Sequence, residues 1–452
     1  MLTFKLFSAL IIVSTAHAAA VSSYLDWKSF HATGINLGGW LVQESTIDTA
    51  WWATYSGGAP DEWGLCANLG SQCGPVLERR YATWITPADI DSFAAAGINT
   101  LRIPTSYAAW TNVPGSQLYS GNQVSFLENI SKYAISKYGM HIIIDIHSLP
   151  GGVNGMAFGE AEGHYGWFNN ATALDYSFQV IDSVISFVTN SQFPESFTIA
   201  PINEPVDVPD ITVFGTPYCL TDDGAKWVQE YIDQVIAKVE AADSRIPVMF
   251  QGSFKGERYW SPNFAAGKNL VFDVHNYYFA GRGASSANLT HFICQDAVAA
   301  AGDGKFPVFI GEWSIQAEID NTFSSRKKNL QTGIAAWKKY TRGSSYWTAK
   351  FFGNATVSGE GTQADYWNYA TFFNEQLGIS VIQGTILNNS SISSSLDVLT
   401  TMPTRSGACE GPEASVPWFR LAKTVRLRQD RAREILGADI DGQSTENASS
   451  EK

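Results

Sequence analysis

The feature that most constrains the fold of this chain is a regular alternation of short apolar segments with longer amphipathic ones. The short segments are rich in β-branched residues, which favour strands, and they are bounded by turn-forming residues. The longer segments show the apolar spacing of helices with one buried face, most clearly at residues 177–188, 225–239 and 326–339. Strands that alternate with helices form a parallel sheet with crossover helices. Eight strands are predicted in all, at residues 34–37, 100–103, 141–145, 198–202, 247–250, 270–274, 308–311 and 345–348.

Eight such units predict an α/β protein, a single (β/α)8 TIM barrel with irregular loop decorations. The alternative is an open, doubly wound sheet, but residues 34–39 lack the glycine spacing of the phosphate-binding loop expected after its first strand. We therefore expect one catalytic barrel over residues 21–436. Within it, residues 354–417, rich in Ser, Thr, Asn and Gly, are expected to form irregular surface structure, and residues 418–436 a closing helix.

Both ends of the chain carry recognisable segments. Residues 1–20 are typical of a secretory signal peptide, with a basic residue near the start, a short apolar run, and small residues at Ala16 and Ala18. The apolar run is shorter than the ~20 residues that a membrane-spanning helix needs. Residues 437–452 are polar and predict a disordered tail rather than a lipid-anchor signal. These segments predict a secreted protein, extracellular or in the cell wall, with no membrane anchor.

The cysteines and glycosylation sequons fit the same compartment. The five cysteines permit at most two internal disulfides, and their spacing matches no zinc-site pattern. Cys66 and Cys73, which lie in a Gly-rich segment, are the favoured pair, and the pairing of the others stays open. Sequons for N-glycosylation lie at Asn129, Asn170, Asn288, Asn354, Asn388, Asn389 and Asn447.

The chain is acidic overall, with a formal net charge of −13. Binding to nucleic acid depends on clustered Lys and Arg, so nucleic acid is not an expected partner. We expect a monomer that acts on a neutral substrate.

Polar residues lie at the ends of several predicted strands, where TIM barrels carry their catalytic side chains. Each one alone also fits a structural role, because a strand-end Arg or Asp often forms an ion pair and a single His is often a hydrogen-bonded core residue. Glu204 and Glu312 are harder to explain in that way, since both follow apolar segments of the same barrel. The residues concerned are Arg102, Asp145, His147, Asn203, Glu204, His275, Tyr277, Glu312 and Trp347.

A pair of carboxyl groups is what hydrolysis of a glycosidic bond requires. One carboxyl group protonates the leaving oxygen, and the other attacks the anomeric carbon or activates water. Glu204 and Glu312, on the fourth and seventh strands, therefore indicate a glycosidase acting on a carbohydrate substrate.

Six blocks of sequence make this interpretation more specific. They occur in order between Gly34 and Lys350, and they are Gly34-Ile35-Asn36-Leu37-Gly38-Gly39-Trp40-Leu41-Val42, Leu101-Arg102-Ile103-Pro104, Asp145-Ile146-His147, Asn203-Glu204-Pro205, His275-Asn276-Tyr277 and Gly311-Glu312-Trp313. Together these blocks resemble the signature blocks of glycoside hydrolase family five. Within that family they are most similar to the fungal exo-β-1,3-glucanase (glucan 1,3-β-glucosidase) group and its relatives, which include fungal diglycosidases such as rutinosidases.

The resemblance implies a retaining mechanism with Glu204 as acid/base and Glu312 as nucleophile, their carboxyl groups ~5–5.5 Å apart. Asn203 would bind the 2-hydroxyl of the sugar, a contact that strengthens in the transition state. Arg102 would keep the nucleophile ionised, and Tyr277 would hydrogen-bond the same carboxylate.

The resemblance also assigns residues to substrate binding. His147 and His275 would line the glucose subsite, and Glu44 would bind sugar hydroxyls. Trp347 would stack on the apolar face of the sugar, and Phe254 would form an aromatic wall on the leaving-group side. No metal or organic cofactor is implied, and the sequence shows no ligand cluster for one.

The mechanism needs different environments for two chemically identical side chains. The pKa of Glu204 should be raised above the reference of about 4.3, while that of Glu312 should be kept low by Arg102. We therefore expect an acidic pH optimum.

Two features depart from the glucanase pattern. The loop after the third strand has Ser148-Leu149 where glucanases usually have Gly-Ala, and it continues differently over residues 156–167. Ala349 stands where a second tryptophan is expected. Because these positions flank the mouth of the pocket, they bear on the substrate more than on the reaction.

The main prediction is a secreted retaining β-glycosidase that releases glucosyl units from β-1,3-glucan or related β-glucosides. The alternative is a rutinosidase-like diglycosidase, a 6-O-rhamnosyl-β-glucosidase acting on flavonoid glycosides. A transglycosylase would share every catalytic residue, and exo and endo action are not separated by the sequence. A non-hydrolytic glucan-binding protein is expected to lack a catalytic carboxylate, whereas both glutamates are present.

Overall fold

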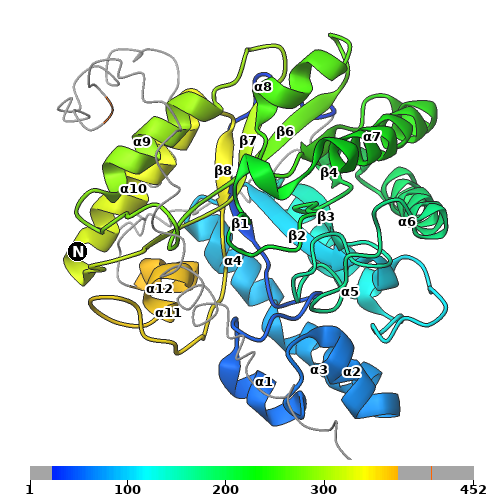
Figure 1. Cartoon of the computed structure of the whole chain (residues 1–452), viewed down its shortest axis with the longest axis horizontal. Helices are drawn as coiled ribbons and strands as arrows, with labels where there is room; N and C mark the ends of the chain where they lie inside the picture. The colour runs from blue at the N-terminus through cyan, green and yellow to red at the C-terminus, as the bar shows by residue number, and fades with distance from the viewer. Residues whose placement is uncertain (1–22, 375–408, 410–452) are drawn as a thin grey trace, which may run out of the picture.

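The strands form a closed parallel barrel (Figure 1). The computed structural model describes residues 23–374 and residue 409. All eight predicted strands are present and pair in sequence order, with β8 next to β1, so the predicted TIM barrel is confirmed. The strands are β1 (Ala32–Asn36), β2 (Thr100–Ser106), β3 (His141–Ser148), β4 (Phe197–Ala200), β5 (Val248–Gln251), β6 (Leu270–Tyr278), β7 (Val308–Ala317) and β8 (Gly343–Tyr346).

Three predictions about the chain ends fall outside the described residues. They are the signal peptide over 1–20, the closing helix over 418–436 and the tail over 437–452, and they remain predictions together with the limits of the barrel at 21 and 436.

The limits of several strands differ from the apolar segments. β6 and β7 extend further than predicted, so His275, Tyr277 and Glu312 lie within strands rather than after them. The pattern missed this because polar side chains at the end of the barrel interrupt the apolar run that marks a buried parallel strand. β8 ends at Tyr346, so Trp347 follows this strand and does not lie in it as predicted.

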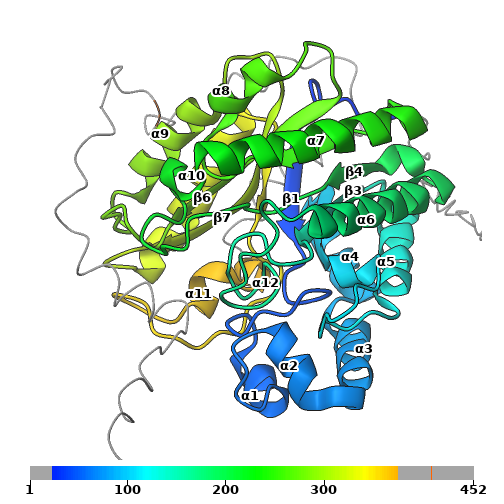
Figure 2. The same cartoon turned by 45° about the vertical axis from the view of Figure 1, so that its right-hand side comes forward.

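Helices cover the outside of the barrel, and Figure 2 shows α6 and α7 running side by side. The predicted segments 177–188, 225–239 and 326–339 are confirmed as parts of α6, α7 and α10. Each helix is longer than its segment. Most of the added terminal residues are exposed and add little to the apolar periodicity, although Ala173 and Leu174 at the start of α6 are buried. The helices are α1 (Thr49–Tyr55), α2 (Glu62–Leu69), α3 (Cys73–Trp84), α4 (Pro87–Ala95), α5 (Gln123–Tyr138), α6 (Ala171–Asn190), α7 (Asp222–Asp243), α8 (Glu257–Trp260), α9 (Leu289–Ala300), α10 (Phe323–Tyr340), α11 (Ala364–Trp367) and α12 (Tyr369–Asn374).

Trp27 fills the amino-terminal end of the barrel. Its side chain is 2% exposed and packs against residues near the starts of strands, including Ile143, Val271 and Phe309. The indole Nε1 donates a hydrogen bond to Thr198 Oγ1 at 3.0 Å. Burial of this large side chain stabilises the end of the barrel that TIM barrels use for stability rather than for catalysis.

The segment after β8 is more ordered than the predicted irregular decoration. Within residues 354–374 it forms α11 and α12, and Tyr366, Tyr369 and Phe372 are buried. The rings of Tyr369 and Phe372 pack against the ring of Tyr346 in β8, with centroid distances of 5.1 and 5.7 Å. The prediction was wrong here because a few buried aromatic residues are outnumbered by Gly, Ser and Thr in the sequence. Residues 375–408 and 410–417 lie outside the described part.

Two disulfides are present. Cys66–Cys73 joins α2 to α3 as predicted, and Cys294–Cys409 joins α9 to residue 409. Cys219 is buried with a free thiol. Within residues 23–374, no helix has the length and apolar character needed to cross a membrane.

Candidate active site

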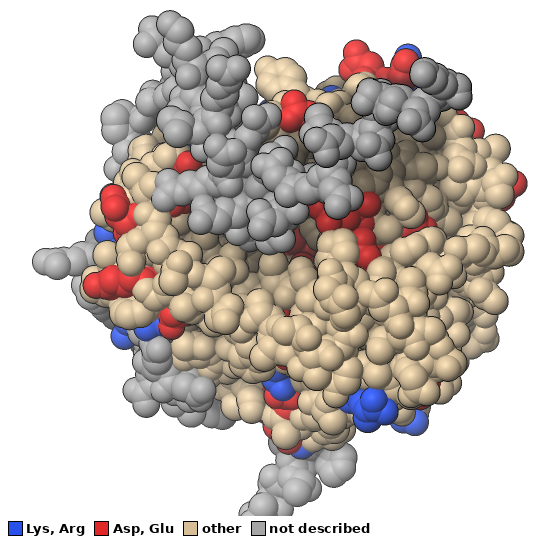
Figure 3. Space-filling model, turned by 60° about the horizontal axis from the view of Figure 1, so that its bottom comes forward, with Lys and Arg blue, Asp and Glu red and all other residues tan. Residues whose placement is uncertain are grey.

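The carboxyl ends of the strands and the loops that follow them form one face of the barrel. α1, α2 and α3, which follow β1, lie on this side (Figure 1). Figure 3 shows the side on which they lie, with a hollow in which Asp and Glu side chains are visible. Glu204 and Glu312 are each only 4% exposed, so both carboxyl groups are largely removed from bulk water.

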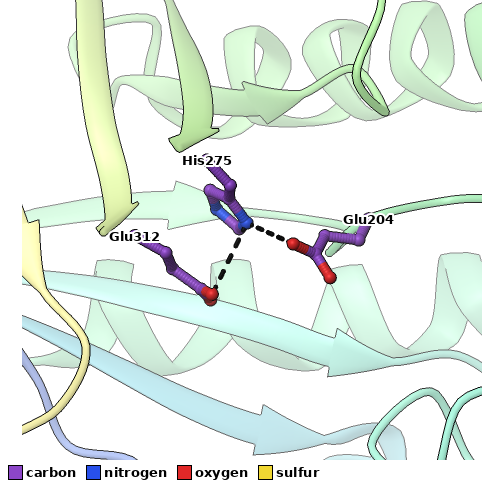
Figure 4. A group of neighbouring side chains, drawn as sticks. All are labelled: Glu204, His275 and Glu312. Carbon is purple, nitrogen blue, oxygen red and sulfur yellow. Dashed lines mark hydrogen bonds and ion pairs between the residues drawn. The ribbon is translucent and has the colours of Figure 1, made fainter. Parts of the chain in front are cut away.

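Glu204, His275 and Glu312 form one contact group (Figure 4). Nδ1 of His275 lies 2.7 Å from Oε1 of Glu204 and 3.6 Å from Oε2 of Glu312. An oxygen of each carboxyl group and a ring nitrogen of His275 all lie within 4.8 Å of one another. This spacing fits the ~5–5.5 Å between the carboxyl groups of retaining glycosidases and is shorter than the ~6.5–9.5 Å of inverting ones.

Both oxygens of Glu312 are held by hydrogen bonds. Nη1 of Arg102 donates to Oε1 at 2.7 Å, and the hydroxyl of Tyr277 donates to Oε2 at 2.8 Å. The structure thus brings together Arg102, Tyr277 and Glu312 as the sequence predicts. Two donors on separate strands fix the orientation of the carboxylate as well as its charge.

Arg102 is fully buried and connects Glu312 to the rest of the site. Its Nη2 donates to Oδ1 of Asn203 at 2.8 Å and lies 3.1 Å from Oδ1 of Asp145. Its Nη1 also donates to Oδ1 of Asn36 at 3.1 Å. Because the carbonyl oxygen of Asn203 accepts from Arg102, the amide nitrogen of Asn203 can donate to a ligand hydroxyl.

The two glutamates have opposite electrostatic environments. Burial raises the pKa of Glu204, and the nearby charge of Glu312 adds to this, while the hydrogen bond to His275 opposes it. Burial also acts to raise the pKa of Glu312, but the positive charges of His275 and Arg102 outweigh it and lower the pKa below its ordinary value. One carboxyl group can therefore hold a proton while the other is ionised, which is the division of labour that acid–base pairs use.

His275 lies between carboxylates on both sides of its ring. Burial acts to lower its pKa, but Glu312, Asp273 and Glu204 outweigh burial and raise the pKa to about 10. Nε2 faces Oδ2 of Asp273 at 3.4 Å, an ion-pair contact. Glu204, His275 and Glu312 are close enough to share a metal ion, but a protonated imidazole has no lone pair to offer one. The group is therefore better suited to proton transfer than to metal binding.

His147 and Trp347 form a stacked pair beside this group. Their rings are nearly parallel, at 11°, with centroids 5.7 Å apart. Nδ1 of His147 contacts Oδ2 of Asp145 at 2.6 Å, which fixes the ring, and Nε2 lies 3.5 Å from the amide nitrogen of Asn203. The structure thus brings the predicted subsite residues His147, Asn203 and Trp347 together, with His147 in contact with both of the others.

Glu44 and Phe254 are less buried than the glutamate pair. Glu44 is partly exposed, and its pKa is raised to about 7 by burial and by the charges of Glu312 and Glu204, while His147 opposes the shift. These interactions place Glu44 at the same site.

Phe254 is partly buried in the loop after β5. Its ring packs against that of Phe214, in the loop after β4, with the ring centroids 5.3 Å apart. This contact joins the two loops through their aromatic side chains.

The loop between β3 and α6, which departs from the glucanase pattern, is closely packed. Glu160 is buried there, and it accepts hydrogen bonds from the Tyr107 hydroxyl at 2.6 Å and from the Gly151 N–H at 3.0 Å. Its other oxygen contacts Nδ1 of His164 at 3.0 Å. A Cβ added at Gly152, where φ is +86°, would lie 2.1 Å from the backbone oxygen of His164. A buried carboxylate and tight glycine contacts therefore fix this loop in one shape.

Trp367 is a site residue that the sequence did not indicate. Its ring stacks on Tyr277, with centroids 5.3 Å apart at 22°, and its Nε1 donates to Gln316. Its backbone oxygen accepts from the Thr348 N–H at 2.9 Å. Ala349, where a second tryptophan is expected from the family pattern, is fully buried. The segment after β8 therefore supports the tyrosine that binds Glu312.

Three further buried polar residues, Asn36, Gln251 and Asp273, were not predicted as site residues, and a fourth, Asp145, was noted at a strand end but given no role. Asn36 and Asp145 lie inside sequence blocks that were recognised, and only their contacts with Arg102 show their role. Asp273 is a charged residue inside an apolar strand segment, a signal that could have identified it. Gln251, at the end of β5, carries no such signal.

Comparisons with known proteins agree with this geometry. The family model described as cellulase, glycosyl hydrolase family 5, matches residues 70–353. A probable glucan 1,3-beta-glucosidase A of Aspergillus niger is 28% identical over 349 residues, which cover 76% of this chain and 77% of that protein.

Two solved structures are more similar. The crystal structure of rutinosidase from Aspergillus niger has 58% identity and a TM-score of 0.78, covering 78% of this chain and 99% of its own. The crystal structure of AoRut has 60% identity and a TM-score of 0.78, covering 79% of this chain and 99% of its own. The family match spans more than half of the chain and includes both glutamates, and so the chain belongs to glycosyl hydrolase family 5.

Proposed function

We propose that this chain is a retaining β-glycosidase in which Glu204 is the acid/base and Glu312 is the nucleophile. The observation that supports this most strongly is the buried trio of Glu204, His275 and Glu312. Its two carboxyl groups are at retaining distance, and the pKa of one is raised while that of the other is lowered.

In the first step, Glu312 attacks the anomeric carbon while Glu204 gives its proton to the leaving oxygen. The bond to the leaving group breaks and a covalent glycosyl-enzyme forms. Arg102 and Tyr277 aim the attacking carboxylate, and Asn203 offers an N–H to the 2-hydroxyl. The protonated His275 stabilises the carboxylate that Glu204 becomes.

In the second step, Glu204 takes a proton from water, which attacks the anomeric carbon and releases Glu312. Trp347, stacked on His147, supplies an aromatic surface for the apolar face of the sugar. Glu44, with a pKa near 7, can donate or accept a hydrogen bond with a sugar hydroxyl.

The proposed substrate is a β-glucoside whose glucose carries a second sugar, as in rutinosides of flavonoids, and the enzyme releases the intact disaccharide. Support comes from the 58% and 60% identity to rutinosidase from Aspergillus niger and to AoRut. The glucan 1,3-beta-glucosidase of the same organism is 28% identical. The alternative stated from the sequence is therefore better supported than the main prediction of a β-1,3-glucan substrate. The closely packed loop after β3 also departs from the glucanase pattern beside the pocket.

Hydrolysis of β-1,3-glucan is the second candidate. It is favoured by the similarity to several glucan 1,3-beta-glucosidases, such as one of Schizosaccharomyces pombe that is 27% identical over 325 residues, 69% of this chain and 75% of that protein. The same catalytic residues serve both reactions, so the two candidates differ in what the outer subsites bind.

We also propose that the protein is secreted as a monomer. The two disulfides favour an oxidising compartment. The sequon residues within the described part, Asn129, Asn170, Asn288 and Asn354, are all exposed and thus open to glycosylation.

The experiment that tests this function compares rutin, laminarin and p-nitrophenyl β-glucoside as substrates and identifies the released sugars by chromatography. Wild type is assayed beside Glu312→Ala and a control, Glu128→Ala, which removes an exposed carboxylate of α5. We expect rutinose from rutin with wild type and the control, and no product with Glu312→Ala. Glucose from laminarin with no cleavage of rutin would favour the second candidate. Inertness of wild type toward all three would contradict the proposal, and transfer products in place of free sugar would identify a transglycosylase.

A further inference from the structure

Glu204 has an unusual backbone conformation. Its φ is +46°, in the left-handed region that non-glycine residues seldom adopt. Such a conformation persists only where its surroundings enforce it, and it often occurs at functional sites. The backbone N–H of Glu204 is held by a single side chain, since it donates to Oε1 of Gln251 at 3.0 Å.

The same oxygen of Gln251 holds a second left-handed residue. Ser253 has a φ of +55°, and its N–H also donates to Oε1 of Gln251 at 3.0 Å. Nε2 of Gln251 donates to the backbone oxygen of Ser253 at 3.3 Å. In the side-chain amide of a glutamine only the oxygen accepts hydrogen bonds, and the nitrogen only donates them, so these bonds fix which way the amide of Gln251 points.

The support under Gln251 is itself rigid. Gln251 is fully buried at the end of β5. Next to it, Nε1 of Trp260 donates to the backbone oxygen of Gly252 at 2.7 Å, and a Cβ added at Gly252 would lie 2.3 Å from that nitrogen. Sγ of Cys219 contacts the hydroxyl of Ser253 at 3.2 Å. The amide of Gln251 therefore cannot move without disturbing a packed turn.

We propose that Gln251 is a positioning residue for the acid/base: its side-chain carbonyl holds the backbone of Glu204 in the left-handed conformation that aims the carboxyl group at the glycosidic oxygen. This inference deepens the proposed function and rests on it. Without the acceptor, the N–H of Glu204 would be buried and unpaired, so the backbone would rotate to satisfy it and the carboxyl group would leave its position.

A positioning role for the acid predicts a dependence on the leaving group. A poor leaving group needs a proton as its bond breaks, whereas 2,4-dinitrophenolate leaves without one. Loss of the position of Glu204 should therefore slow glycosylation with a phenyl glycoside and leave glycosylation with a dinitrophenyl glycoside almost unchanged. A general loss of packing would slow both substrates equally.

The test measures kcat/KM with phenyl and 2,4-dinitrophenyl β-glycosides of the sugar that wild type releases. Gln251→Met keeps the length of the side chain and removes the acceptor, while Gln251→Glu keeps an oxygen acceptor. Gln123→Met is the matched control, because Gln123 is also a buried glutamine that binds loop backbone, accepting from the Gly121 N–H at 2.8 Å, but it lies at the start of α5.

We expect Gln251→Met to lose about 100-fold in kcat/KM on the phenyl glycoside, at the low end of the effect of general acid catalysis, and less than about threefold on the dinitrophenyl glycoside. Gln251→Glu should keep the wild-type dependence on the leaving group, with the basic limb of its pH profile moved to higher pH by the added negative charge. Gln123→Met should show the same kcat/KM as wild type on both substrates.

Equal losses on both glycosides, or no loss on either, would overturn the positioning role of Gln251. Retained activity on the dinitrophenyl glycoside shows that the variant is folded, so misfolding cannot imitate the expected result. Failure of the proposed function is distinguishable, because wild type itself would then cleave neither glycoside.

Discussion

Nη1 of Arg102 donates a hydrogen bond to Oε1 of Glu312 at 2.7 Å, and both side chains are nearly removed from solvent. A charge-assisted bond in such an environment is stronger than one at the surface. With Tyr277 on the other oxygen, it keeps Glu312 ionised and aimed beside a second carboxyl group that holds a proton. The predictions below follow from this difference between two chemically identical side chains.

The pH dependence should be bell-shaped with an acidic optimum. The active form has Glu312 ionised and Glu204 protonated, so activity falls as pH drops through the lowered pKa of Glu312 and as it rises through the raised pKa of Glu204. His275, with a pKa of about 10, keeps its charge across this range. The measurement is kcat/KM against pH, and activity that persists unchanged to pH 9 would contradict the assignment.

Tyr277→Phe removes one hydrogen bond from the ionised Glu312. Bonds to charged groups contribute about 1.5–3 kcal/mol, so we expect kcat/KM to fall by roughly 10- to 150-fold. The loss should also raise the pKa of Glu312 and move the acidic limb of the pH profile to higher pH. A suitable control is Tyr133→Phe, because Tyr133 donates to Asp91 on the surface at 2.7 Å. A fall in kcat/KM without movement of the acidic limb would argue against the contact with the nucleophile.

The loss of kcat/KM caused by Glu204→Ala should depend on the leaving group of the substrate. We expect kcat/KM on an unactivated glycoside to drop by about 10²–10⁴, the usual contribution of general acid catalysis, and a dinitrophenyl glycoside to be little affected. Azide should then restore turnover and yield a β-glycosyl azide, because this anion needs no general base. Product analysis by NMR checks this, and an α-glycosyl azide would point to inversion instead.

Trp27→Ala tests the fold independently of the chemistry. Removal of a buried tryptophan from the amino-terminal end of the barrel should lower the free energy of unfolding by about 3–5 kcal/mol. Because the site lies at the other end of the strands, kcat/KM at a permissive temperature should equal that of wild type. Denaturant unfolding and steady-state kinetics on the same preparation give both values. A large change in kcat/KM without loss of stability would show that the two ends are coupled.

The sequence predicts much of the fold because eight short apolar segments alternate regularly with longer amphipathic segments along the chain. One error arises because polar residues at the end of the barrel break the apolar pattern, so the continuation of β6 and β7 through His275 and Glu312 was not recognised. The two helices after β8 were missed because a few aromatic residues supply all of their burial.

The contact network was only partly predictable. Arg102, Tyr277 and Glu312 meet as the family resemblance implies, because they lie on strands whose order the fold dictates. The backbone support of Glu204 by Gln251 depends on two left-handed residues in separate loops, and no local sequence pattern encodes it. Likewise, Trp367 reaches Tyr277 from a segment about 90 residues along the chain, and only the closed barrel brings them together.

The most direct test of the central claim is to trap the covalent intermediate. Wild type is treated with a 2-deoxy-2-fluoro glycoside that carries a good leaving group, and the intact protein and its peptides are analysed by mass spectrometry. The mechanism predicts one glycosyl group per chain, attached to the peptide that contains Glu312, and no labelling of Glu312→Ala. A label on Glu204 would contradict the assignment of Glu312 as the nucleophile. Hydrolysis of the fluoro glycoside with no labelled protein detected would contradict it as well.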